Sequence, residues 1–123
     1  MALSDIHNEP VLETEQLESL LMAAGAEGLN EIMDAYWRST QGLIDSLKTQ
    51  AAEGDLEEAA RTAHAIKGSS SNIGAQLMAN LAKVFENACR DGDGEALRVA
   101  VDAADDAVDA TRKAVTDLIA AAG

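Results

Sequence analysis

Apolar side chains recur every third or fourth residue through most of this chain, and this spacing limits what the chain can fold into. Such a spacing gives a helix one apolar stripe that can be buried against other helices. Alanine and leucine dominate, and long runs of β-branched residues are absent, which favours helices over sheets. The sequence of 123 residues therefore predicts a single all-α domain large enough to bury a core.

Glycine and aspartate residues divide the apolar stripes into separate helices. We predict a short helix over about 14–25 and four long helices over about 27–54, 55–74, 75–91 and 95–121. The third begins with a capping-box pattern, in which Asp55 is followed by Glu58. Long amphipathic helices with short connections predict an up-down-up-down four-helix bundle, here preceded by the short helix. Residues 1–12, which include Pro10, are expected to form a flexible lead to a domain of residues 13–123.

The third predicted helix carries a histidine away from its apolar stripe. The stripe consists of small and apolar residues at helical spacing: Leu56, Ala59, Ala63, Ile66, Ser70 and Ile73. His64 lies on the other side of the helix, so its imidazole is expected to meet solvent. Lys67 and Gly68 follow one turn later and are its neighbours on the same surface.

These three residues together indicate chemistry on a phosphoryl group. A histidine side chain in water has a pKa of about 6.5, so its neutral form is available as a nucleophile near pH 7. A lysine one turn away can neutralise the charge of a phosphoryl group held on the imidazole. A glycine inside a helix costs about 1 kcal/mol relative to alanine. Gly68 therefore indicates that something bulky must approach His64 closely.

The whole stretch resembles the signature of histidine-containing phosphotransfer (HPt) domains. That pattern is His, any residue, an apolar residue, Lys, Gly, two small residues, three of any kind, Gly and a small residue. The chain matches it with His64, Ile66, Lys67, Gly68, Ser69, Ser70, Gly74 and Ala75. The resemblance covers most of the chain from about residue 17, and residues 63–86 carry its specific features. It implies a four-helix core with a phospho-accepting His64 exposed midway along one helix.

The resemblance also implies the partners and one further site residue. A response-regulator receiver domain, which can belong to a hybrid histidine kinase, carries the phosphoryl group on an aspartate with its own magnesium ion. The imidazole accepts the group and passes it to another receiver. The chain is then a phosphocarrier without an ATP site of its own, and we assign it no cofactor and no metal. The family often has Glu or Gln after an apolar residue where this chain has Phe85 and Glu86. The Glu86 carboxylate could orient the imidazole or simply be solvated.

Two other functions remain open on the sequence. A histidine-kinase dimerisation domain also presents a histidine on a helical bundle, but it commonly has an acidic residue after the histidine and a nearby proline. Here Ala65 and Ile66 follow His64, and Pro10 is remote. A non-catalytic helical adaptor that binds response regulators would leave the exposed His64 face unexplained. Phosphorylation by a phosphorylated receiver, with and without His64, separates these functions.

The charge of the chain limits its partners. Acidic residues number 22 against 9 basic ones, and the formal net charge is −13. Such a chain lacks the basic patch that nucleic acids require and is repelled by anionic membrane surfaces. No apolar stretch is long enough to predict a transmembrane helix, and the acidic N-terminus does not resemble a secretory signal. Cys89 is the single cysteine, which excludes an internal disulfide and fits a reducing compartment. We expect a cytoplasmic monomer.

Overall fold

The computed structural model describes residues 1–122, and all of their regular structure is helical. The elements in chain order are the 3-10 helix η1 (Leu3–Asp5) and the α-helices α1 (Thr14–Glu53), α2 (Leu56–Ile73), α3 (Gln76–Arg90), α4 (Gly94–Val101) and α5 (Ala104–Ala122). The described residues contain no strand, so the predicted all-α class is confirmed.

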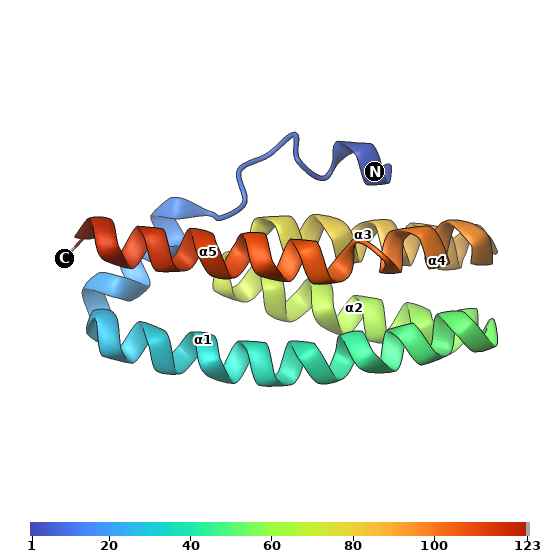
Figure 1. Ribbon diagram of the computed structural model, residues 1–123, viewed down its shortest axis with the longest axis horizontal. Helices are drawn as coiled ribbons and strands as arrows, with labels where there is room; N and C mark the ends of the chain where they lie inside the picture. Colours follow the sequence, from blue (N-terminus) through green and yellow to red (C-terminus); the bar gives the residue numbers. More distant parts are fainter. Residues whose placement is uncertain (123) are drawn as a thin grey trace.

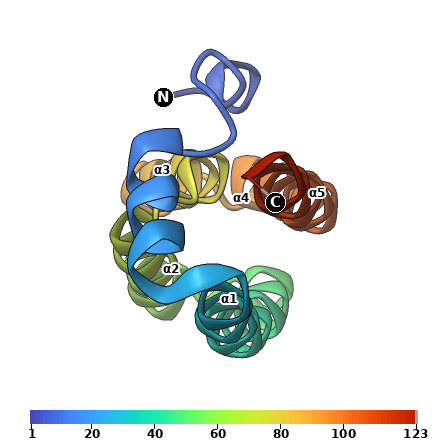
Figure 2. The same ribbon diagram turned by 90° about the vertical axis from the view of Figure 1, so that its left-hand side faces the viewer.

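The helices lie side by side along one long axis (Figure 1). The chain reverses direction between α1 and α2, between α2 and α3, and again before α4, whereas α4 and α5 follow one another along nearly the same line. Viewed along the axis, α1, α2, α3 and the α4–α5 pair surround a common core (Figure 2). The most extensive contact joins α2 to α3. These two helices carry all of the candidate site residues.

Glycines in the left-handed region end both α1 and α2. Gly54 has φ 74° and Gly74 has φ 82°, a backbone conformation that is costly for any residue with a Cβ atom. Beyond Gly74, the backbone N–H of Ala75 donates to the carbonyl of Ser70 at 2.9 Å, which satisfies one of the last carbonyls of α2. At the other end of α2, the Asp55 side chain accepts a hydrogen bond from the backbone three residues later at 3.2 Å. The Asp55 half of the predicted capping box is therefore formed, whereas the Asp55 N–H donates to the Gln50 carbonyl at 2.9 Å and not to the Glu58 side chain.

The apolar stripe of α2 is buried in the bundle. Five of its predicted members are buried: Ala59, Ala63, Ile66, Ser70 and Ile73. The fully buried hydroxyl of Ser70 forms a hydrogen bond with the hydroxyl of Tyr36 on α1, with 2.5 Å between the oxygens. Tyr36 and Trp37 add the aromatic part of the core, and their ring centroids lie 4.8 Å apart. Burial of this stripe leaves the opposite face of α2 to solvent.

Two helix boundaries differ from the sequence prediction. The helix predicted over 95–121 is divided into α4 and α5, because the Ala103 N–H donates to the Ala100 carbonyl at 3.1 Å and tightens the chain between them. No glycine or proline marks this break. Near the N-terminus, α1 runs from residue 14 to 53, with a kink at Gly25 (φ 76°, ψ 171°). The part of α1 before Gly25 is turned away from the bundle axis (Figure 2).

The first thirteen residues run along the outside of the bundle next to α3 (Figure 1). Ile6 is 4% exposed and Leu12 is 7% exposed, so both side chains belong to the core. The mobility expected of residues 1–12 stays a prediction. Their packing is important for the site, because they contact the helix that carries Glu86.

Candidate functional site

Three predicted site residues share the exposed face of α2. The side chain of His64 is 72% exposed and that of Lys67 is 36% exposed. Gly68 is also exposed, one turn beyond His64 in the same helix. Burial of the apolar stripe of α2 turns this face outward, so the fold places the three residues together as the helical spacing predicts.

Glu86 of α3 joins two of these side chains. Its Oε2 atom lies 3.4 Å from Nδ1 of His64, and its Oε1 atom lies 2.7 Å from Nζ of Lys67. One carboxylate therefore contacts the histidine with one oxygen and the lysine with the other. When Nδ1 of the imidazole carries the proton, it donates to Glu86, and Nε2 keeps the lone pair that a nucleophile needs.

The pKa of Glu86 is lower than that of an ordinary glutamate. Partial burial acts in the opposite direction and raises the pKa, but the hydrogen bonds and positive charges of Lys67 and His64 outweigh it. The carboxylate therefore stays ionised at neutral pH. An ionised Glu86 can only accept hydrogen bonds, which favours the histidine tautomer with the proton on Nδ1.

Gly68 has free space around it. A Cβ atom added at this position would meet no other atom within 4 Å. Crowding inside the protein therefore does not explain the glycine, and helix propensity disfavours it. The backbone at Gly68 is therefore open to the surface beside His64.

A groove of about 670 Å³ lies beside the site, between α2 and α3. Its lining includes the basic side chains Lys67, Lys83 and Arg90 and the thiol of Cys89. Burial, and then the negative charge of Glu86, raise the pKa of the Cys89 thiol. A protonated thiol is a weak nucleophile, so Cys89 is not an activated group. On this face, His64 is the side chain suited to nucleophilic chemistry.

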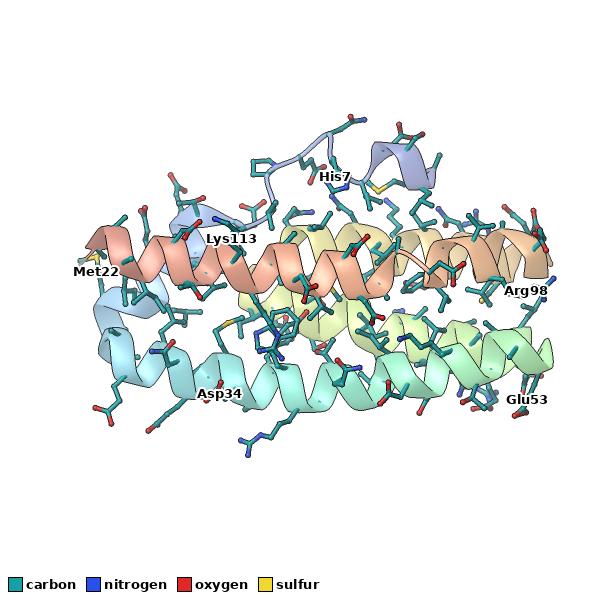
Figure 3. The ribbon with its side chains drawn as sticks, in the orientation of Figure 1. His7, Met22, Asp34, Glu53, Arg98 and Lys113 are labelled. Carbon is teal, nitrogen blue, oxygen red and sulfur yellow. The ribbon has the colours of Figure 1, made fainter. Side chains whose placement is uncertain are left out.

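The sequence pattern anticipated part of this arrangement. The contact between His64 and Glu86 was one of two alternatives, and the structure places the two side chains together. The ion pair between Lys67 and Glu86 was missed, because no helical spacing relates residues on different helices. The second histidine, His7, is exposed on the N-terminal segment rather than on α2 (Figure 3).

Residues 1–122 lack two kinds of feature. Within that range, no three His, Cys, Asp or Glu side chains are grouped so that they could hold a metal ion. None of the helices there combines the length and the apolar character needed to cross a membrane.

The sequence of this helical bundle matches the Hpt domain family over residues 31–114. The chain belongs to the Hpt domain family. The match covers more than half of the chain and includes the whole of α2 and α3. No curated protein and no solved structure matches the chain. Hpt domains are phosphocarrier modules of phosphorelays and interact with receiver domains, so this Hpt domain has a phosphotransfer role.

Proposed function

We propose that this Hpt domain accepts a phosphoryl group on His64 from the aspartate of one receiver domain and passes it to another receiver. The proposal rests on the exposed imidazole of His64, which Glu86 holds beside Lys67 and the open surface at Gly68. We assign phosphoryl acceptance to His64 and charge neutralisation to Lys67. Gly68 provides clearance for the docked partner, and Glu86 orients the imidazole.

The proposed transfer is a displacement at phosphorus. The lone pair on Nε2 of neutral His64 forms the N–P bond, while the P–O bond to the receiver's aspartate breaks and the carboxylate leaves with the bonding electrons. The proton on Nδ1 stays on the ring, so the product has a positively charged imidazole ring that bears the negatively charged phosphoryl group on Nε2 and faces Glu86 with Nδ1. The carboxylate stabilises the charge of the ring, and the reverse displacement delivers the phosphoryl group to the next receiver.

Lys67 has two negative groups within its reach in this scheme. In the unphosphorylated protein it pairs with Glu86 at 2.7 Å. A phosphoryl group on Nε2 would bring negative charge to the same surface, one turn from the lysine. The long stem and three donors of lysine allow it to share its charge between the carboxylate and a phosphoryl oxygen. The magnesium ion of the reaction belongs to the receiver, so this chain needs no cofactor.

The other assignments belong to the same proposal. We take the chain to be a cytoplasmic monomer that carries phosphate without an ATP site and binds receivers of response regulators or of a hybrid kinase. Its net charge of −13 disfavours binding to nucleic acids and to anionic membranes. We take residues 13–123 as its domain, with an up-down-up-down order of the four long helices after a short N-terminal helix.

Replacement of His64 by glutamine tests the proposal. The assay uses a purified receiver domain that carries radioactive phosphate on its aspartate. Wild-type protein should take the label, which should be acid-labile and base-stable like a phosphoramidate, and His64→Gln should take none while keeping its circular dichroism spectrum. Undiminished labelling of His64→Gln would rule out His64 as the acceptor, and an acid-stable label would identify a serine instead. Receiver binding without any labelling of the wild type would support an adaptor.

A further inference from the structure

The start of the chain is bonded to the end of α2. The backbone N–H of Glu13 donates to the carbonyl of Gly74 at 2.8 Å. The side-chain amide of Gln16 donates to the carbonyl of Asn72 at 2.5 Å. Carbonyls at the end of a helix have no partner within it, so these bonds hold the last turn of α2 from outside.

The same segment caps α3. Ala75 at the N-cap position has no side chain that could accept a hydrogen bond from the first turn of the helix. The carbonyl of Val11 takes this place and accepts a hydrogen bond from the N–H of Leu77 at 3.0 Å. Residues 11–16 therefore bind the helix that ends before the turn at Gly74 and the helix that begins after it.

Contacts continue along α3 toward Glu86. Asn80 is 5% exposed, and its side-chain amide donates to the carbonyl of Ile6 at 3.3 Å. Further on, Met1 and Asn87 line the same hollow. At about 100° per residue, Asn80 and Asn87 lie about 100–120° around the helix from Glu86. The segment therefore supports α3 on a flank that differs from the one facing His64.

We propose that residues 1–16, the N-terminal clamp, position Glu86 against His64 and Lys67 by fixing the rotation of α3 relative to α2. The separation of 3.4 Å between Nδ1 of His64 and Glu86 lies near the limit of a hydrogen bond. A separation of about 3.6 Å no longer forms one, so a shift of a few tenths of an ångström in α3 is enough to break it. The inference rests on the proposed function of the site, but it concerns a property of the unphosphorylated protein.

The test releases the clamp in the full-length chain. The double variant Ile6→Ser/Leu12→Ser places polar groups at two buried clamp positions. Faster hydrogen exchange at the Glu13 and Leu77 amides reports release. The nitrogen NMR shift of His64 Nδ1 reports the contact with the carboxylate, and Glu86→Ala gives its value without that contact. In the double variant the shift should move toward the Glu86→Ala value. Transfer at saturating receiver should slow by up to about tenfold with little change in KM.

A matched variant separates positioning from a general loss of stability. Leu47→Ala removes a fully buried side chain on α1, outside the clamp, and should lower stability without moving the His64 shift. The conservative variant Ile6→Val/Leu12→Ile should keep both the shift and the transfer rate. If the double variant does not fold, Asn80→Ala replaces it. This change removes the bond to the Ile6 carbonyl together with the bond that Asn80 accepts from the Gln76 side chain, and Gln76→Ala, which removes the second bond alone, is its control.

Three results would contradict the proposed role of the clamp. The first is faster exchange of the Glu13 and Leu77 amides in the double variant with an unchanged His64 shift. The second is an equal change of the His64 shift in Leu47→Ala, and the third is full transfer activity in the double variant. The shift is measured without phosphate. The His64 shift could therefore move in the double variant even if the wild type never accepted phosphate. That result would refute the proposed function and support the proposed role of the clamp.

Discussion

Replacement of Gly68 by glutamine should stabilise the fold and slow transfer at the same time. A Cβ atom at this position meets nothing within 4 Å, so the new side chain can enter solvent without strain. Glycine is among the poorest helix formers, and its replacement here should add about 0.5–1 kcal/mol to the free energy of unfolding. For a domain of this size, the melting temperature should rise by about 2–6 °C.

The same side chain would stand one turn from His64, on the surface where the receiver must dock. Transfer requires the reacting atoms to come within about 3–3.5 Å of each other, and a misplacement of about 1 Å can cost about 100-fold in rate. Gly68→Gln should therefore transfer at least about 100-fold more slowly with every receiver, while Gly68→Ala should lie between it and the wild type.

Gly42 offers a matched control. It is an exposed helical glycine on α1 with no atom within 4 Å of an added Cβ, so Gly42→Gln should give the same stabilisation. Thermal melts measure the stability of both variants, and rapid-quench transfer from a phosphorylated receiver measures their rates. If Gly68→Gln transferred as fast as Gly42→Gln, clearance for a partner would not be the reason for the glycine.

Three further changes address the other contacts. Lys67→Ala should slow transfer but change the free energy of unfolding by less than about 1 kcal/mol, because its ion pair is partly solvated; urea melts and transfer kinetics distinguish this from a structural role. Because the folded-state pKa of Glu86 is lowered, the stabilisation from its contacts should be complete above the ordinary glutamate pKa and lost as the pH falls through the folded value. A carboxyl NMR titration measures this, and Glu86→Gln should abolish that part of the pH dependence. Gly74→Ala should cost about 1–3 kcal/mol, because the new Cβ adds a collision with Leu17 to the strain of a positive φ. Gly54→Ala has a similar φ and no such collision, so equal costs in urea melts would contradict this account.

The exposed face of α2 could be predicted because a helix relates its own residues by fixed angles. Once Ala63 and Ile66 are assigned to the core, His64 and Gly68 must lie on the exposed side of the helix, with Lys67 at the edge between that side and the core. The family signature falls on this one helix and its end, so the most specific part of the sequence is also the part that local geometry determines.

Contacts between residues on different helices could be established only from the structure. Glu86 meets Lys67 only because α2 and α3 pack in one particular register, and helical periodicity contains no information about that register. The break between α4 and α5 has no glycine or proline to mark it. Ile6 and Leu12 are buried through tertiary packing alone, since the apolar residues of this segment form no recognisable period.

The placement of the site within the chain has a consequence for the order of folding. The contact between His64 and Glu86 spans 22 residues, whereas the bonds that reach Asn72 from Gln16 and Ile6 from Asn80 span 56 and 74 residues. Closing a longer loop costs more chain entropy, and local contacts form faster than distant ones. We therefore expect the hairpin of α2 and α3 to form before the N-terminal segment docks on it. Residues 1–16 then dock on a hairpin that has already formed.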